Sequence, residues 1–594
     1  MTSNPPRLGP TVRRSVPVVI WLITGLFVAA GLVQTAVFPN VRSPDELRHV
    51  DLVVQVEQGR AWPWPDPGTS FVSVGTDAGH FLFEDRLPGP QHLTDRVEDA
   101  PGSAGHVPPR GERASFDEAG AFETLHDDRD DDGLQEPVLN QLVQHPPLYY
   151  VLGAGLLRLV PDWTAAPMDQ VWLWLRWLNV LLAAPLPILL WASARRLRLP
   201  EPLPVAAALA PLAVPEMSHL LTAVNNDNLL VSLGAALTYL LVRVMTGDLT
   251  RRTALLVGLV TTAGMLTKGF ALMFPALILL AYGVAALRSR PRWKAAAGSL
   301  LVAAAACVPG ALWWVRNLVL YGAIQPHGTH TTMPDLTPVY GWSDGGWRWL
   351  SRMLERFVTT FFVQDHASAR QLDPSVIAAW VVFLGILTAI VFALVRRTIP
   401  RATAVVLLAG APLLGAIVAK GSWEQFAAFA NDHAAQQGRY LYTGFAGVAL
   451  VAIAGTAALP AVWRRRVPAV VLGLALVLHV TFQYDTWNLY WMPRGADGPD
   501  AVFRAAAAMA YWYPWNPWIL LAVIAAGIAT AAGVTWQVVR AARTTDGVGP
   551  DNGVGPAAGV GPDAAPEAGT GAPAGPRDAT APHDPLGADP EPAR

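Results

Sequence analysis

The feature that most constrains this chain is a series of long apolar segments separated by short, arginine-rich loops. A helix that crosses a bilayer needs about 20 mostly apolar residues, and many segments of the chain have that length. Charged residues make up 15% of the chain, against about 25% in an ordinary soluble protein. The sequence therefore predicts an all-α polytopic membrane protein. Twelve spans are expected, at about 16–38, 170–193, 203–221, 226–246, 253–267, 269–287, 296–320, 375–395, 402–419, 440–462, 467–483 and 515–539.

The net charge of −2 conceals a segregation of charge along the chain. Segments 39–146 and 544–594 carry net charges of −13 and −6, and the remaining residues carry +17. The basic residues form seven clusters beside the expected spans, and such clusters mark cytoplasmic loops. With the N-terminus inside, all seven clusters are cytoplasmic only if 253–287 crosses twice, with a break near Thr267–Gly269. Both termini are then cytoplasmic.

Outside the spans, the sequence predicts two surface helices and a disordered tail. Segment 147–160 is too short to cross and is expected to lie on the outer membrane surface. Segment 347–362 is expected to be a second interfacial helix with an apolar face. The tail 544–594 is rich in Ala, Pro and Gly and cannot build a core, whereas the insert 84–133 is either flexible or a small cap. The expected organisation is an N-terminal segment with the first span (1–38), an extracytoplasmic loop with its juxtamembrane helix (39–169), spans 2–7 (170–321), a second extracytoplasmic loop (322–374), spans 8–12 (375–543) and a cytoplasmic tail (544–594).

A small set of polar side chains falls at the outer boundary of the expected spans, where lipid makes isolated polar groups unfavourable. Distant parts of the chain thus supply carboxylates and cations at one depth. This arrangement suits an amphiphilic, anionic ligand such as a lipid phosphate. The set comprises Asp45, Glu46, Arg48, His49, His145, Asn225, Asn226, Asp227, Lys268, Arg316, Asn317 and Arg439.

These residues also have structural interpretations. Ser43-Pro44-Asp45-Glu46 fits a capping box at a helix start, with Ser43 as the cap. Asn225-Asn226-Asp227 is a common helix-starting cluster, and His145 lies in a turn before two prolines. Arg316 and Arg439 can extend to lipid headgroups. The acidic run 127–132 fits a solvated loop or a calcium site.

Several other functional classes are disfavoured. Cys307 is the only cysteine, which excludes a disulfide scaffold. The sequence contains no zinc-ligand spacing, P-loop or dinucleotide fingerprint, and no nucleic-acid partner is expected. A twelve-span transporter or flippase is the alternative from another class. Major-facilitator transporters place their longest loop between two similar halves, whereas here it follows the first span and repeated halves are not visible.

The order of the polar motifs resembles that of the GT-C fold integral membrane glycosyltransferases over about residues 16–540. The resemblance is closest to a bacterial branch of uncharacterised membrane proteins related to protein mannosyltransferases and to the aminoarabinose transferase of lipid A. The motifs in chain order are Pro44-Asp45-Glu46-x-x-His49, His145-Pro146-Pro147-Leu148-Tyr149-Tyr150, Asn225-Asn226-Asp227, Thr267-Lys268, Trp314-x-Arg316-Asn317 with Tyr321-Gly322, and Gln437-Gly438-Arg439-Tyr440.

The resemblance implies a GT-C-like fold and transfer of a sugar from a polyprenyl-phosphate donor on the outer side of the cytoplasmic membrane. It implies that Asp45, with Glu46 beside it, acts as general base. Lys268, Arg316 and Arg439 are expected to bind the donor phosphate, and attack opposite the leaving group implies inversion. Substrate-binding roles are expected for His49, His145, Tyr149, Asn225, Asn226, Asp227, Asn317 and Tyr440.

The sequence leaves the sugar and the acceptor open. Arginine outnumbers lysine by 40 to 3, which hints at a GC-rich bacterial genome and thus at a cell-wall glycan or lipoglycan acceptor. A protein acceptor is also compatible with the resemblance. Some members of the resembled class use a divalent cation and others do not, so metal dependence stays open.

Overall fold

The computed structural model describes residues 16–40, 43, 45–59, 110, 113, 115–117, 126–127, 136–137, 141–288, 293–326, 337–362, 374–432, 434–492 and 498–543. The predictions for the tail 544–594, for most of the insert 84–133 and for the acidic run beyond Asp127 lie outside these residues.

The described residues are almost entirely helical, which confirms the expected fold class. The only strands among them are β1 (His126–Asp127) and β2 (Glu136–Pro137), an antiparallel pair. The α-helices are α1 (Val18–Val37), α2 (Glu46–Glu57), α4 (Leu148–Arg158), α5 (Met168–Ala183), α6 (Leu186–Arg196), α7 (Leu203–Leu209), α8 (Pro215–Leu220), α9 (Asp227–Met245), α10 (Arg251–Met265), α11 (Phe274–Arg288), α12 (Trp293–Tyr321), α13 (Gly346–Phe362), α14 (Pro374–Arg396), α15 (Arg401–Phe429), α16 (Phe445–Gly455), α17 (Ala461–Tyr490), α18 (Pro499–Trp512) and α19 (Pro517–Arg543). The 3₁₀ helices are η2 (Gln141–Gln144), η3 (Trp163–Ala165), η4 (Ala210–Ala213), η5 (Gly269–Met273), η7 (Trp342–Asp344), η9 (Gly438–Gly444) and η10 (Thr456–Ala458).

Ten helical segments of the described chain are long and apolar enough to cross a membrane. The other two expected spans form shorter helices: 203–221 becomes α7, η4 and α8, and 253–267 becomes the 15-residue α10. The count of twelve crossings therefore stays a prediction. The ten segments are Val18–Val37, Met168–Arg196, Asp227–Met245, Gly269–Arg288, Trp293–Tyr321, Val376–Arg396, Arg401–Phe429, Gly438–Ala458, Ala461–Tyr490 and Pro517–Arg543.

Helices α10 and α11 run in opposite directions, as the double crossing of 253–287 requires. Nη2 of Arg243 at the end of α9 donates to the hydroxyl of Thr253 at the start of α10, at 2.8 Å. Nη1 of Arg288 at the end of α11 donates to the carbonyl of Met245, again at the end of α9, at 3.1 Å. The chain therefore turns back between these two contacts, at the break that contains Lys268.

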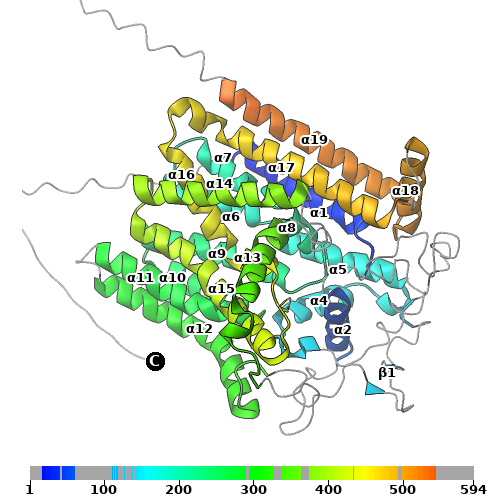
Figure 1. Cartoon of the computed structure of the whole chain (residues 1–594), viewed down its shortest axis with the longest axis horizontal. Helices are drawn as coiled ribbons and strands as arrows, with labels where there is room; N and C mark the ends of the chain where they lie inside the picture. The colour runs from blue at the N-terminus through cyan, green and yellow to red at the C-terminus, as the bar shows by residue number, and fades with distance from the viewer. Residues whose placement is uncertain are drawn as a thin grey trace, which may run out of the picture. The chain divides into compact units, whose positions relative to one another are not determined.

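The basic loops gather at one end of the helices. Arg196 Nε donates to the Thr246 hydroxyl at 2.7 Å, and Arg288 Nη2 donates to the Thr403 hydroxyl at 2.8 Å. We call this the arginine end, defined by Arg196, Arg243 and Arg288. The opposite end, which includes α2, α4 and α18 (Figure 1), is called the site end.

Helices α4, α13 and α18 at the site end, like α2, lie outside the ten candidate spans. Helix α4 occupies the predicted segment 147–160 and packs on α2. Helix α13 occupies the predicted segment 347–362, and Trp347 and Leu354 of its predicted apolar face are 72% and 51% exposed. That exposure suits a helix lying in a membrane surface. Helix α18 was not predicted.

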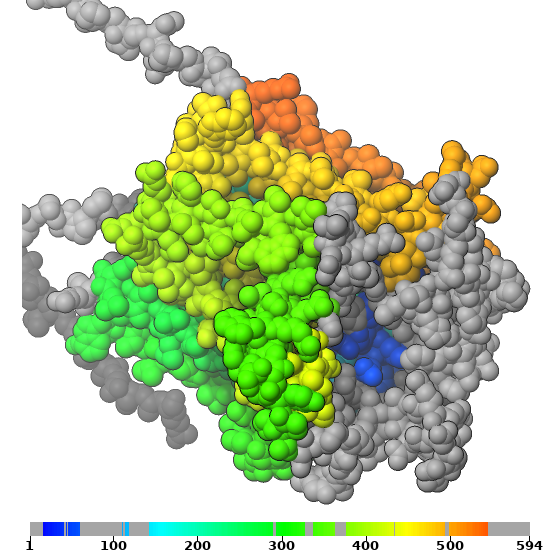
Figure 2. All heavy atoms as spheres, in the orientation of Figure 1, coloured from blue at the N-terminus to red at the C-terminus, as the bar shows by residue number. Residues whose placement is uncertain are grey.

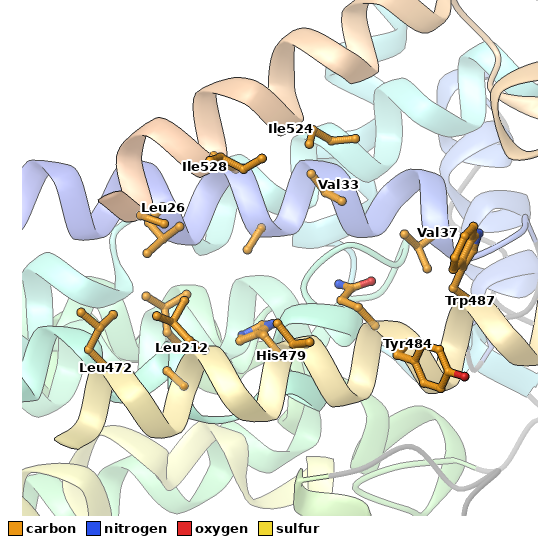
Figure 3. Close-up of a pocket in the computed structure, with 18 of the residues that line it drawn as sticks. Leu26, Val33, Val37, Leu212, Leu472, His479, Tyr484, Trp487, Ile524 and Ile528 are labelled. Atoms are coloured by element: carbon orange, nitrogen blue, oxygen red, sulfur yellow. The ribbon is translucent and has the colours of Figure 1, made fainter. Parts of the chain in front are cut away.

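A cavity of about 540 Å³ lies between α1, α17 and α19 (Figure 3). Its walls are almost entirely hydrocarbon, and His479 is one of its few polar lining residues. None of the predicted site residues lines it. The charged groups of interest are instead at the site end.

Candidate active site

Asp45 and Arg439 meet at the site end although 394 positions separate them in the sequence. Nη2 of Arg439 lies 3.3 Å from Oδ2 of Asp45, and Nη1 of Arg48 lies 3.8 Å from Oδ1. Asp45 immediately precedes α2 and has φ of 59°, in the left-handed region. Its side chain is 33% exposed, whereas that of Arg439 is 5% exposed. A partly accessible carboxylate thus faces a buried cation. In Figure 2 part of the N-terminal segment, in blue, is visible at the surface to the right of the green and yellow segments.

Arg439 is positioned by close packing of η9 against α13. The amide of Gly438 donates to the hydroxyl of Thr360 at 2.7 Å, and the Tyr442 hydroxyl donates to the Phe361 carbonyl at 2.7 Å. A Cβ atom at Gly438 would lie 2.4 Å from the Phe361 amide nitrogen and 2.5 Å from the Phe357 carbonyl oxygen. Only glycine allows this approach, so α13 determines where Arg439 stands.

A second ion pair joins the break after α10 to the start of α9. Nζ of Lys268 donates to Oδ1 of Asp227 at 2.6 Å, and both side chains are buried. Lys268 Nζ lies 5.8 Å from the centroid of the Tyr440 ring, and the Arg439 guanidinium lies 5.4 Å from the same ring. Tyr440 therefore neighbours both cations. The amide of Asp227 donates to Oδ1 of Asn225 at 2.8 Å, as a helix start would require.

Imidazole and phenol groups from α2, α4 and the turn before α4 lie beside these charges. His49 Nδ1 is 3.0 Å from the Tyr150 hydroxyl, and the rings of His49 and His145 are parallel with centroids 6.4 Å apart. Burial, and then the charge of Lys268, lowers the pKa of His145 to about 3. Burial likewise holds the pKa of His49 well below its usual value. Both imidazoles are thus neutral at pH 7. The neighbouring Tyr149 hydroxyl donates to Oδ1 of Asn179 at 3.0 Å.

Several buried polar atoms of this group lack a hydrogen-bond partner within the part of the chain that the structure describes. They are Nδ1 of His145, Oδ1 of Asn226, Oδ2 of Asp227, and Nε and Nη1 of Arg439. Buried polar atoms are nearly always paired in folded proteins. Donors and acceptors left over at one place indicate a binding site for a polar ligand.

Glu46 faces away from these groups into a buried anchor. Its carboxylate accepts hydrogen bonds from Nε and Nη2 of Arg176 at 2.8 and 2.7 Å, and from the Val224 amide at 3.0 Å. Glu46 is 1% exposed and Arg176 is 1% exposed. The arrangement fixes α2 on α5 and leaves the carboxylate with little access to a substrate.

Ser43 does not cap α2 as the capping-box interpretation expected. The residue that precedes the helix is Asp45, which makes no capping hydrogen bond. The Ser43 hydroxyl instead lies 3.1 Å from Nε2 of His219. The expectation was wrong because a partner 176 positions away takes the hydroxyl.

Arg316 and Asn317 lie at the site end of α12 in a separate set of contacts. The Arg316 guanidinium is 5.5 Å from the Trp313 ring centroid, and Asn317 Nδ2 donates to the Ile324 carbonyl at 3.2 Å. The chain just beyond approaches the Lys268 break, because a Cβ atom at Gly269 would lie 2.7 Å from Oε1 of Gln325. A role of Arg316 in phosphate binding stays a prediction.

Sequence reasoning missed Arg176, Glu216 and His219, which are all buried. A signal was available, since each is an ionisable residue inside an expected span. Such residues are rare in spans and are almost always paired or functional. In the described segments, His, Cys, Asp and Glu side chains form no group of three or more that could hold a metal ion.

Comparison with known proteins finds one family match and several similar structures. Residues 144–314 match the family model of dolichyl-phosphate-mannose-protein mannosyltransferase. ArnT from Cupriavidus metallidurans bound to undecaprenyl phosphate is 13% identical, with 90% of this chain and 78% of that chain covered and a TM-score of 0.42. The oligosaccharyltransferase AglB from Archaeoglobus fulgidus, in complex with an inhibitory peptide and a dolichol-phosphate, is 13% identical, with a TM-score of 0.31. It is matched over 87% of this chain but only 56% of its own. No curated protein matches the chain.

The family match and the all-helical polytopic fold confirm the resemblance to GT-C membrane glycosyltransferases. Within that class, residues 144–314 are similar to the protein mannosyltransferases.

Proposed function

We propose that this protein transfers a sugar from a polyprenyl-phosphate donor to an extracytoplasmic acceptor, with inversion at the anomeric carbon. The observation that carries the proposal is the meeting of Asp45 with Arg439, next to the Asp227–Lys268 pair and a set of unsatisfied buried polar atoms. A carboxylate and buried cations at one place are what such a transfer needs. The mannosyltransferase family match over 144–314 supports a donor carried on a lipid phosphate.

Asp45 is the proposed base. Its carboxylate accepts the proton of the acceptor hydroxyl as that oxygen bonds to the anomeric carbon. The bond between the anomeric carbon and the phosphate oxygen breaks, and the phosphate keeps the electron pair. Arg439 and Lys268 stabilise the charge that develops there, and Arg316 is a third proposed phosphate ligand. Glu46, which pairs with Arg176, positions the base rather than sharing its role.

The remaining polar groups are proposed to bind the sugar. His49, His145 and Tyr149 are buried, and the two imidazoles are neutral, so they hydrogen-bond without adding charge. Asn226 offers its Oδ1 atom, while Asn225, Asn317 and Tyr440 shape the surroundings. The acceptor is a cell-wall glycan, a lipoglycan or a protein.

The proposed sidedness rests on the basic loops. Arg196, Arg243 and Arg288 lie together at the arginine end, away from Asp45 along the helices. Clusters of this kind mark the cytoplasmic side. We therefore place the site end on the extracytoplasmic face of the cytoplasmic membrane, with both termini inside.

The test compares transfer with binding in the purified full-length protein. The assay follows release of undecaprenyl phosphate from a panel of undecaprenyl-phosphate hexoses and pentoses, in the presence of a membrane or cell-wall extract as acceptor. Asp45→Asn is expected to lower the transfer rate by roughly 10²–10⁴-fold, the usual contribution of a general base. The same variant should bind undecaprenyl phosphate more tightly, because Arg439 loses a competing carboxylate at 3.3 Å. Arg439→Gln should weaken that binding.

Asp162→Asn is the matched control. Asp162 also has a positive φ, of 50°, and is an exposed aspartate just beyond α4. Its replacement should change neither transfer nor binding. Full transfer by Asp45→Asn would remove Asp45 as the base, and binding of undecaprenyl phosphate without turnover of any donor would contradict the enzyme class.

A further inference from the structure

A chain of three polar side chains leads from α8 to the turn that carries Asp45. The Glu216 carboxylate lies 3.2 Å from Nδ1 of His219, and Nε2 of His219 lies 3.1 Å from the Ser43 hydroxyl. A carboxylate oxygen accepts, so Nδ1 of His219 donates to Glu216. Nε2 of His219 and the Ser43 hydroxyl share the second hydrogen bond, two residues before Asp45.

The three residues have the order of a carboxylate–imidazole–hydroxyl triad, but their burial points to another role. Ser43 is 3% exposed and His219 is 0% exposed, and the Ser43 hydroxyl and both ring nitrogens of His219 already have partners within the chain. The His219 ring also stacks on Phe38, with centroids 3.7 Å apart and an angle of 15° between planes. A side chain held on this many sides is suited to fixing a position.

Helix α8 is well placed to set that position. It packs against α1, which leads into the Asp45 turn, and also against α13 and η9, which hold Arg439. The relative placement of Asp45 and Arg439 can therefore be set from one short helix. On the other side of Asp45, Glu46 is tied to Arg176. The base lies between two buried anchors.

The backbone of Asp45 needs such anchoring. A residue other than glycine at φ of 59° is in a sparsely populated conformation. Conformations of this kind persist only where the surrounding structure determines them. The two contacts that flank Asp45 in sequence, through Ser43 and through Glu46, supply that constraint.

We infer that the Ser43–His219–Glu216 chain is a positioning device that holds the Asp45 carboxylate against Arg439. The inference rests on the proposed function, in which Asp45 is the base. Ser43, His219 and Glu216 are positioning residues and do not touch the substrate.

The first test does not depend on activity. Hydrogen–deuterium exchange is measured on full-length wild type, Ser43→Ala and Ser43→Thr in detergent. The amides of Glu46 and His49, which bond to the carbonyls of Ser43 and Asp45, should exchange about fivefold faster in Ser43→Ala, the effect of one lost hydrogen bond. Ser43→Thr retains a hydroxyl and should restore protection. Ser218 lies on α8 next to His219, and its hydroxyl contacts His479 of α17. Ser218→Ala is therefore the matched control and should leave these amides unchanged.

The second test separates positioning from folding and from binding. Ser43→Ala should lower kcat for the undecaprenyl-phosphate donor by roughly 10- to 100-fold, without weakening the binding of undecaprenyl phosphate. In the Asp45→Asn background, adding Ser43→Ala should not lower the residual rate further, because both changes act through one carboxylate.

The outcomes distinguish this inference from the proposed function. Unchanged exchange at Glu46 and His49 in Ser43→Ala overturns the positioning device whatever the enzyme does. If Asp45→Asn is inactive but Ser43→Ala keeps its kcat, only the positioning device fails. If Asp45→Asn is fully active while Ser43→Ala shows faster exchange, the anchor stands and the base assignment fails.

Discussion

Replacing Arg176 with Met should strongly destabilise the protein. The guanidinium donates to both oxygens of Glu46 and to the carbonyls of Thr35, Phe38 and Pro39, at 2.7–3.0 Å. Side chains of the pair are 2% and 0% exposed. Removing one member of a buried pair leaves a charge without compensation and costs about 3–5 kcal/mol. The free energy of unfolding should fall by that amount.

The matched control is Arg158→Met. Arg158 also pairs with a glutamate of α2, Glu57, but at 3.9 Å and with its own side chain 59% exposed. Exposed pairs contribute about 0–1 kcal/mol. Unfolding is followed by tryptophan fluorescence in mixed micelles of increasing dodecyl sulfate content. The double variant Glu46→Gln/Arg176→Met removes both charges and should recover part of the loss. A loss below about 1 kcal/mol in Arg176→Met would refute the view that this pair anchors α2.

Three further predictions follow from the site. Gly438→Ala places a Cβ atom 2.4 Å from the Phe361 amide nitrogen, so η9 must shift, and transfer should fall by roughly 100-fold; Gly473→Ala, where the same atom would meet open space, should leave the transfer rate unchanged. Lys268→Met leaves the Asp227 carboxylate buried without its partner and should lower both stability and affinity for undecaprenyl phosphate, whereas Lys268→Met/Asp227→Asn should regain stability but not affinity. The pKa of His145 falls from 6.5 to about 3 on folding. As the pH drops below 6.5, the unfolded state therefore binds a proton before the folded state does. The contribution of His145 to the free energy of unfolding is full above pH 6.5 and is lost as the pH falls toward 3. Unfolding titrations at pH 7 and pH 5 should differ by about 2 kcal/mol less in His145→Gln than in wild type, and an equal difference would exclude His145 as the titrating group.

The sequence predicted the membrane-spanning class and most helix positions because each long apolar run satisfies one local rule. Helix α18 was missed because that rule finds only crossings, and the 14-residue α18 (Pro499–Trp512) is too short to cross a membrane. Its C-terminal end is held by Arg113, which donates to the Tyr511 carbonyl at 2.8 Å from 398 positions away. Such a contact leaves no local trace in sequence.

The candidate site shows the same division. Asp45, Asp227, Lys268 and Arg439 could be chosen from sequence because each is a charged residue at the expected boundary of the bilayer. Their pairing could not, since the sequence does not tell which of several charges at one depth will meet. Ser43 was assigned to the local capping pattern because its true partner, His219, lies on a helix that sequence reasoning treated as an uninterrupted apolar span.

The two ion pairs differ in a way that bears on the proposed reaction. Asp227 and Lys268 are buried and 2.6 Å apart, whereas Asp45 and Arg439 are 3.3 Å apart with the carboxylate one-third exposed. The second pair is therefore the one that a donor phosphate can open. With Arg48 included, the two pairs have two carboxylates and three cations, an excess of one positive charge, and the proposed ligand Arg316 adds a second. A sugar phosphodiester brings one negative charge to this positive site. As the sugar departs, the lipid phosphate gains a second negative charge, and Asp45 loses its own by taking the acceptor proton. The total charge is therefore the same before and after the step, and no new uncompensated charge has to be stabilised.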